Sequence, residues 1–311
     1  MTDVGLVGMG VIGRLYAVNL LKAYQQIRVY DIDPEKAGAL ADRGARPVET
    51  ARALAEASDV IIMALPSPEA VESAMTGPKG LLAGVRSGAI IVDLSTIDPD
   101  TSIRMYGLAR DKGVAYLDAP ISGGAPQGAG TDGARNATVT FMVSGDQDAF
   151  ERARPVMKSL GKEFFYLGPP GMGTIVKLLS NLVSGLINLV CAEAFVLGAA
   201  AGIKPETLLE VFDETDANSY FLKEYISPRI KKRDFEPGFS VDLMYKDHRL
   251  AGELAKRLGI PLPLNDLATQ IYQMQRAQGL GQKDLVEAVR FWGRTSGADI
   301  YQPREAYQGR S

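Results

Sequence analysis

Short apolar runs alternate with helical patterns along the first half of the chain. The apolar runs cover residues 4–7, 27–30, 60–65, 88–93, 114–117, 138–143 and 163–167. Helical patterns lie between them, in residues 15–23, 34–43, 50–56 and 146–160 and after Pro99. Continuous apolar strands separated by helices are typical of a parallel sheet that is covered on both faces. The pattern therefore predicts an α/β fold built on a doubly wound sheet.

One segment is longer and more apolar than the others. From residue 175 to 201 nearly every residue is apolar or small and none is proline, which predicts a long, mostly buried helix. A polar stripe runs along one face of this helix, because i, i+4, i+7 and i+11 are occupied by Lys177, Asn181, Ser184 and Asn188. Two explanations stay open. Lys177 lies beside a ligand or counter-ion, or its stem covers apolar surface while its ammonium reaches water.

The second half of the chain predicts helices and no convincing strand. The cluster Gly168-Pro169-Pro170-Gly171 ends the alternation of strands and helices, so we expect a domain boundary there. After the long helix, further helices are predicted to begin near residues 205, 241 and 263. The tail after Gly297 is polar, and we expect it to be loosely held. The expected domains are residues 1–168 and 169–311.

Composition and charge argue against several classes of protein. A net charge of −3 and a pI near 5.5 give no reason to expect nucleic-acid binding. The long apolar segment is interrupted by polar residues, and no other segment of the chain is hydrophobic enough to accompany it in a membrane. No membrane span is therefore predicted. Cys191 is the only cysteine and is expected to be a packed thiol; with His248 the only histidine, no metal site is expected. No leader is visible after Met1, so we expect a cytoplasmic protein.

A dinucleotide-binding fingerprint, G-x-G-x-x-G, follows the first predicted strand and opens a helix. Its residues are Gly8, Met9, Gly10, Val11, Ile12 and Gly13. The glycines allow a tight turn and close approach of a pyrophosphate to the free N–H groups of the helix start. Asp31 follows the second strand, where a carboxylate would bind the ribose hydroxyls and repel a 2′-phosphate, so NAD is favoured over NADP. The alternative for Asp31 is a turn cap ahead of Asp33.

Further candidates follow other strands. Ligands of such sheets bind at the carboxyl ends of the strands, so the candidate cofactor contacts there are Leu65, Pro66 and Thr96. Each could also be an ordinary turn residue. Ser122-Gly123-Gly124 ends another strand and offers a hydroxyl and bare N–H groups to a carboxylate, although a flexible turn would have the same composition.

Four segments in this order resemble the β-hydroxyacid dehydrogenase family, and the resemblance covers almost the whole chain. They are the glycine fingerprint, residues 93–99 (Asp-Leu-Ser-Thr-Ile-Asp-Pro), residues 118–124 (Asp-Ala-Pro-Ile-Ser-Gly-Gly) and residues 171–177 (Gly-Met-Gly-Thr-Ile-Val-Lys), with Lys246-Asp247 downstream. The resemblance implies an N-terminal Rossmann domain that binds NAD, a long interdomain helix and an all-α domain for substrate binding and oligomerisation. It also implies a homodimer or homotetramer.

The resemblance implies a role for several residues. Lys177 would be the catalytic acid/base, Asn181 would hold the substrate, and Thr96 and Lys246 would contact the cofactor. The substrate carboxylate would bind at Ser122, Gly123 and Gly124. The expected reaction interconverts a small 3-hydroxy acid and its semialdehyde, with hydride passing to NAD⁺ and the hydroxyl proton to the lysine amine.

The chain departs from the family pattern at three places, and the second of them lies near the expected substrate site. Ser180 stands where a second asparagine is common, the loop at residues 125–137 is longer than expected, and His248 replaces an apolar residue. We expect His248 at the surface or as a cap. Two other functions stay open: an imine reductase-like enzyme, which normally lacks this lysine, and an inactive dinucleotide-binding scaffold, which would be expected to lose Lys177.

Overall fold

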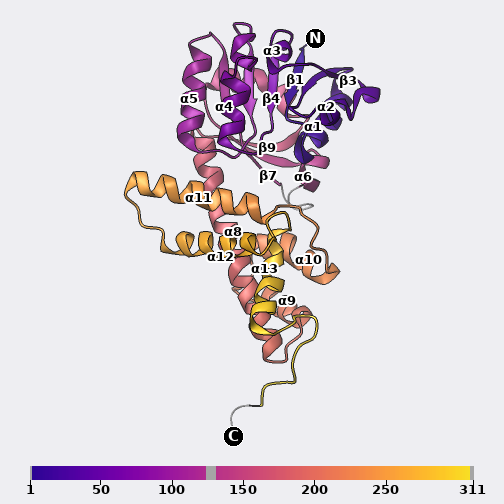
Figure 1. The fold of residues 1–311 in the computed structure, drawn as a ribbon, viewed down its shortest axis with the longest axis vertical. Coiled ribbons are helices and arrows are strands. Elements are labelled where there is room, and N and C mark those ends of the chain that lie inside the picture. The colour runs from indigo at the N-terminus through magenta and orange to yellow at the C-terminus, as the bar shows by residue number, and fades with distance from the viewer. Residues whose placement is uncertain (1, 124–130, 309–311) are drawn as a thin grey trace. The chain divides into compact units, whose positions relative to one another are not determined.

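The computed structural model describes residues 2–123 and 131–308. Contacts divide the chain into two compact units, Met1–Leu178 and Leu179–Ser311. Every strand of the described residues lies in the first unit, and the second unit is built from helices (Figure 1).

The first unit is organised around a six-stranded parallel sheet. Its strands are β1 (Val4–Val7), β2 (Ile27–Tyr30), β3 (Ala45–Pro47), β4 (Val60–Met63), β5 (Ile90–Asp93) and β6 (Ala115–Asp118). Their order is β3-β2-β1-β4-β5-β6, so the order reverses between β1 and β4. Parallel pairing places the last residues of the strands along one edge, as Val7 beside Met63 and Met63 beside Asp93 show. The predicted doubly wound sheet is confirmed.

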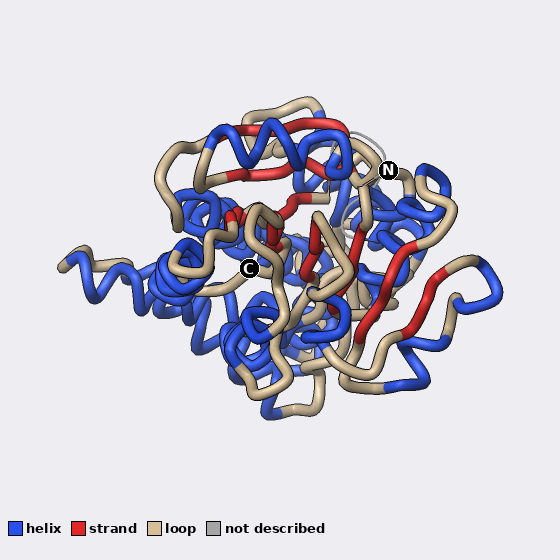
Figure 2. The backbone as a smooth tube through the Cα atoms, turned by 90° about the horizontal axis from the view of Figure 1, so that it is seen from above, coloured by secondary structure: helices blue, strands red, loops and turns tan. Residues whose placement is uncertain are grey.

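Helices cover both faces of this sheet. They are α1 (Val11–Ala23), α2 (Pro34–Gly38), α3 (Ala51–Ala55), α4 (Pro68–Thr76) and α5 (Pro99–Arg110), with short 3₁₀ turns η1 (Ala41–Arg43) and η2 (Leu81–Ala83). Side chains alternate along each strand, so Leu6 and Ile62 face the core that contains α1, whereas Val7 and Ile61 face the core that contains α3, α4 and α5. Each such buried aliphatic side chain contributes about 1.5–3 kcal/mol to folding. The strands are red in Figure 2.

The edge strand β3 and the helix α4 were not predicted. The predicted helix at residues 34–43 is the short α2 followed by η1, and the chain then forms the edge strand β3, which has only one buried residue. Three residues with little apolar content carry too weak a pattern to be read as a strand. The helix α4 was also missed, although Ser67 caps its start and Pro68 occupies its first turn.

A separate three-stranded sheet follows the main one, which corrects the expectation of a single sheet. Its strands are β7 (Ile121–Ser122), β8 (Val139–Val143) and β9 (Gly161–Tyr166), in that order. Only two residues separate β6 from β7. The strand β7 pairs antiparallel with β8, and α7 (Gln147–Met157) supplies the crossover that connects β8 to its parallel neighbour β9.

Part of the predicted loop at residues 125–137 is a helix. The helix α6 (Thr131–Arg135) packs on α1, where the Asn19 side chain donates a hydrogen bond to the Ala134 carbonyl at 2.7 Å. Gly133 lies so close to the Gly123 carbonyl that an added Cβ would be 1.7 Å from its oxygen. Residues 125–130 of the loop lie outside the described residues.

The second unit is formed by the continuation of α8 (Met172–Ala200) and the helices that follow it. They are α9 (Pro205–Asp213), the π-helical turn η3 (Leu222–Ile226), α10 (Ser227–Lys232), α11 (Val241–Leu258), α12 (Pro263–Ala277), η4 (Leu285–Glu287) and α13 (Ala288–Ser296). The predicted starts of α9, α11 and α12 are confirmed. Among the described residues, α8 is the one helix long and apolar enough to cross a membrane. Half of its most apolar stretch is buried inside the protein, as in a core helix.

The described part of the tail, residues 298–308, is docked, contrary to the prediction of a loosely held end. The Tyr301 hydroxyl donates to the Ile230 carbonyl at 3.0 Å. The amides of Arg304 and Tyr307 donate to the carbonyls of Ala199 and Ala201 at 3.0 and 3.1 Å. Carbonyls at a helix end need such donors, so the tail caps the C-terminus of α8.

We predict that Ala137→Gly stabilises the protein. Ala137 has φ of 53°, in the left-handed region that costs a non-glycine residue about 1–2 kcal/mol. Glycine removes this strain but gains freedom in the unfolded chain, so the free energy of unfolding should rise by about 0.5–1 kcal/mol in urea denaturation. The matched control is Ala74→Gly within α4, which should lower it by about 1 kcal/mol. An equal loss in both variants would contradict the prediction.

Candidate active site

The three fingerprint glycines have different surroundings. Gly8 has φ of 93°, and an added Cβ would be 2.4 Å from the Ala64 carbonyl oxygen. At Gly13 a Cβ would be 1.8 Å from the Gly8 oxygen, so α1 lies directly against the loop. At Gly10, by contrast, a Cβ would have no atom of the described chain within 4 Å. The open side of the loop is therefore at Gly10, beside the first turn of α1, where a pyrophosphate would fit.

Asp31 is located where the sequence predicts, directly after β2. One carboxylate oxygen accepts a hydrogen bond from the Met9 amide at 2.7 Å, and the other accepts one from the Asp33 amide at 2.9 Å. Asp31 therefore braces the glycine loop and also caps the turn, which was the alternative role. A carboxylate oxygen accepts two hydrogen bonds, so these contacts are compatible with a ribose hydroxyl.

A chain of hydrogen bonds connects the loops after β4 and β5. The Leu65 amide donates to the Ser95 hydroxyl oxygen at 2.9 Å, and the Ser95 amide donates to Asp93 at 2.9 Å. The Tyr116 hydroxyl donates to the other Asp93 oxygen at 2.7 Å. Burial of this carboxyl raises the pKa of Asp93 to about 6. Leu65 and Thr96, two predicted cofactor contacts, thus lie next to this hydrogen-bonded chain. The sequence did not reveal that Asp93 anchors the chain.

Lys177 lies in the second turn of α8 and is 7 % exposed. This low exposure disfavours the alternative in which its ammonium simply reaches water. Ser122 and Gly123 are half-buried at the end of β7. Gly124, the last residue of the predicted carboxylate receptor, lies outside the described residues.

In the second unit, Asn181 and Lys246 meet at one buried carboxylate. The Asn181 side-chain amide donates to Asp247 at 2.5 Å, and the Lys246 ammonium lies 3.2 Å from the other Asp247 oxygen. Asp247 is 1 % exposed. Because an unpaired buried carboxylate is costly, these two side chains and Asp247 stabilise one another.

His248 is fully buried, so the expectation of a surface or capping role was wrong. Its Nδ1 lies 2.8 Å from the Asn265 side-chain oxygen. Its Nε2 faces Gly185 of α8, where an added Cβ would be 2.1 Å away. Burial lowers the pKa of His248, which favours the neutral ring. The residue therefore packs α11 against α8, and its place beside Lys246 and Asp247 is explained by packing.

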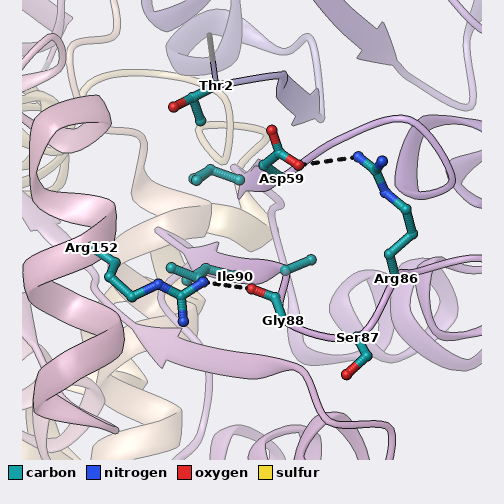
Figure 3. A pocket seen from close by; sticks show the side chains of 9 residues that line it. Thr2, Asp59, Arg86, Ser87, Gly88, Ile90 and Arg152 are labelled. Carbon is teal, nitrogen blue, oxygen red and sulfur yellow. Dashed lines mark hydrogen bonds and ion pairs between the residues drawn. The ribbon is translucent and has the colours of Figure 1, made fainter.

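A hollow of about 510 Å³ lies at the opposite edge of the main sheet, near the amino ends of β4 and β5 (Figure 3). Arg86 forms an ion pair with Asp59 at 3.1 Å, and Arg152 donates to the Gly88 carbonyl at 2.7 Å. Ligands of parallel sheets bind at the carboxyl ends of the strands, so this hollow is not the cofactor site. Within the described residues, no cluster of three or more His, Cys, Asp or Glu side chains could hold a metal ion.

Family models match most of the chain. Residues 3–168 match the family model for the NAD binding domain of 6-phosphogluconate dehydrogenase, and residues 171–292 match the model described as NAD-binding of NADP-dependent 3-hydroxyisobutyrate dehydrogenase. The 2-(hydroxymethyl)glutarate dehydrogenase of Eubacterium barkeri is 36% identical over 297 residues, which cover 96% of this chain and 97% of that relative.

Two further relatives are similar over most of their length. The NAD-dependent L-serine dehydrogenase of Pseudomonas aeruginosa is 33% identical, with 96% of this chain and 100% of that relative covered. The solved structure of Mycobacterium tuberculosis 3-hydroxyisobutyrate dehydrogenase with L-serine has a TM-score of 0.84 at 30% identity, with 94% of this chain and 99% of that chain covered.

The chain belongs to the β-hydroxyacid dehydrogenase family, as its motifs predict. It is accordingly an NAD(P)-dependent oxidoreductase of the hydroxyacid dehydrogenase type.

We predict that Gly10→Ala weakens cofactor binding without unfolding the protein. The residue has φ of −66°, which alanine adopts, and the methyl group would enter the open space beside α1. The Kd for NADH, measured by fluorescence titration, should rise about tenfold or more, since the methyl would meet the pyrophosphate. The control is Gly107→Ala in α5, where the added Cβ also has open space. An unchanged Kd in Gly10→Ala would remove this loop from the cofactor site.

Proposed function

We propose that this protein interconverts a small 3-hydroxy acid and its semialdehyde, with Lys177 as the general acid/base. The observation that carries the proposal is a lysine with 7 % exposure on α8, in the Gly-x-Gly-x-x-x-Lys segment of a hydroxyacid dehydrogenase. A lysine is rarely buried to this degree without a specific task, and proton transfer is such a task.

The reaction needs one hydride acceptor and one proton acceptor. A bound nicotinamide cofactor would supply the acceptor for the hydride of the carbon that carries the hydroxyl group. The neutral amine of Lys177 takes the hydroxyl proton as the carbonyl forms. In the reverse direction the Lys177 ammonium returns this proton to the oxygen, so atoms and charge balance. Asn181, one helical turn further along α8, orients the substrate in this scheme.

The relatives suggest the chemical class of the substrate. L-serine, 3-hydroxyisobutyrate and 2-(hydroxymethyl)glutarate, which appear in their names, all carry a carboxylate and a hydroxymethyl group on the same carbon. We infer a 3-hydroxypropanoate with a substituent at C2 as the substrate here. Its carboxylate would bind at Ser122, Gly123 and Gly124, through a hydroxyl and backbone N–H groups.

We further infer that the cofactor is NAD rather than NADP. The carboxylate of Asp31 after β2 favours ribose hydroxyls and repels a 2′-phosphate. The remaining cofactor contacts in this proposal are Leu65, Pro66 and Thr96, which follow β4 and β5, and Lys246 of α11.

Oligomerisation through the helical residues is a further part of the proposal, with 169–311 as the substrate and oligomerisation domain. Val183, Val190 and Leu197 of α8 are spaced seven residues apart and are 56, 60 and 72 % exposed. Such a spacing puts them on one side of the helix, and a row of exposed aliphatic side chains is typical of an interface. We infer a homodimer or homotetramer in the cytoplasm.

Lys177→Ala should separate catalysis from cofactor binding. Without the proton acceptor, kcat should fall by about two orders of magnitude or more, while the Kd for NADH changes little. Steady-state kinetics and fluorescence titration measure the two quantities, and Lys112→Ala at an exposed turn is the control. Near-normal turnover in Lys177→Ala would remove this residue from the catalytic role.

Asp31→Ser should relax the preference for NAD. The ratio of kcat/KM with NAD to that with NADP is expected to fall by about tenfold, because the repulsion of the 2′-phosphate is lost. The control is Asp33→Ser, since Asp33 caps α2 and serine is an equally good cap. If both variants kept the original ratio, the ribose contact of Asp31 would be wrong.

Leu197→Asp should weaken the assembly. A carboxylate in an apolar interface is strongly unfavourable, so the mass in solution, measured by light scattering, should shift to a smaller species. Val211→Asp in α9, where 51 % of the side chain is exposed, is the control. A single unchanged mass for both variants would place the interface elsewhere.

A further inference from the structure

A buried carboxylate at the end of β6 holds the beginning of α8. Asp118 is 1 % exposed. One of its oxygens accepts hydrogen bonds from the Gly171 amide at 3.1 Å and the Ser144 hydroxyl at 2.6 Å. The other accepts the Thr174 amide at 3.0 Å. Ser144 in turn accepts the Gly173 amide at 2.9 Å, so three amides at the start of α8 are bound to one carboxylate and one hydroxyl. We call this set the Asp118 clamp.

The two glycines of the segment are required by this contact. Gly171 has φ of 89°, a conformation that strains other residues. An added Cβ at Gly173 would be 2.2 Å from the Met142 carbonyl oxygen. The backbone at the helix start therefore lies against the ends of β6 and β8, with no space for a side chain between them.

The electrostatics of the clamp are favourable. The first amides of a helix lack partners within the helix and carry partial positive charge. A carboxylate that accepts several N–H and O–H groups forms hydrogen bonds that are about twice as strong as neutral ones. The desolvation of Asp118 is offset in this way, and α8 is fixed in both rotation and axial position at its first turn.

The fixed start of α8 also determines the position of Lys177. It follows Thr174 by three residues, which is about 4.5 Å along the helix axis and less than one turn. A general acid/base must be within about 2.6–3.2 Å of the proton that it transfers. A displacement of about 1 Å can lower the rate by about 100-fold. A small rotation of the first turn would therefore move the lysine amine out of reach of the substrate oxygen.

We propose that Asp118 and Ser144 are positioning residues for the reaction: the Asp118 clamp sets the rotation of α8 that presents Lys177 for proton transfer. This inference rests on the proposed role of Lys177. The clamp acts through the helix backbone.

The test compares Asp118→Asn and Ser144→Ala with the wild type. In Asp118→Asn an amide N–H₂ group would face an N–H or O–H donor, so at least one clamp hydrogen bond is lost. We expect kcat to fall 10- to 100-fold, while the Kd for NADH and the substrate KM change less than about threefold. The solvent deuterium isotope effect on kcat should increase, because proton transfer becomes slower relative to product release.

Two controls separate positioning from a general loss of folded protein. Asp98 caps α5 by accepting the Thr101 amide at 2.9 Å, so Asp98→Asn is the matched change at another helix start. Val71→Ala in α4 removes buried side-chain volume and matches the loss of stability. Both controls should leave the solvent isotope effect unchanged. Partial unfolding lowers the amount of active enzyme but does not alter this ratio.

Hydrogen exchange tests the clamp independently of catalysis. Amides of residues 171–177 should exchange at least about tenfold faster in Asp118→Asn than in the wild type. In the double variant Asp118→Asn/Ser144→Ala, the loss of exchange protection should be smaller than the sum of the losses in the two single variants, because the two residues share one hydrogen-bond network. Unchanged exchange would show that the clamp does not hold the helix. Faster exchange with an unchanged isotope effect would show that the clamp does not position Lys177. Either result overturns the inference and leaves Lys177 as the proposed catalyst, whereas normal turnover in Lys177→Ala would overturn the proposed catalyst and, with it, the positioning role.

Discussion

One buried carboxylate connects the main sheet of the first unit to the start of α8. Asp118 ends the last strand of the main sheet, and its oxygens receive the first amides of the longest helix. A carboxylate is tolerated in a protein interior only when hydrogen-bond donors replace the water molecules that it loses on burial. Here the donors belong to the segment that carries Lys177, so the same interaction that satisfies the sheet end also orients the proposed catalyst. In the proposed mechanism, stability and chemistry therefore depend on the same few atoms.

The shape of the glycine loop is a second constraint, and it determines where the proposed cofactor site is open. Gly8 and Gly13 are needed for close backbone contacts, whereas the space at Gly10 is open. Asp31 and the chain from Leu65 through Ser95 to Asp93 fix the neighbouring loops from behind. A dinucleotide binds to free N–H groups in an open turn. Such a turn must be held rigid by the residues around it, because the ligand does not order the loop itself.

Sequence predicted the parts of this molecule that are governed by local pattern. The parallel sheet, α8 and the glycine fingerprint were predicted because period, length and turn chemistry all point to one answer there. Burial of His248, docking of the tail on Ala199 and Ala201, and the small sheet of β7, β8 and β9 depend on distant contacts that a single sequence does not encode locally. The roles of Asp93 and Asp118 were missed for the same reason: an aspartate at a strand end resembles an ordinary turn residue until its partners are known.

The most direct test of the account is NADH formation by the purified protein with a panel of 3-hydroxypropanoates that differ at C2, together with the reverse reaction on their semialdehydes. We predict that at least one member reacts with NAD and kcat/KM above about 10⁴ M⁻¹ s⁻¹. The panel should contain L-serine, 3-hydroxyisobutyrate and 2-(hydroxymethyl)glutarate. Firm NADH binding with no hydride transfer to or from any member would contradict the proposed function.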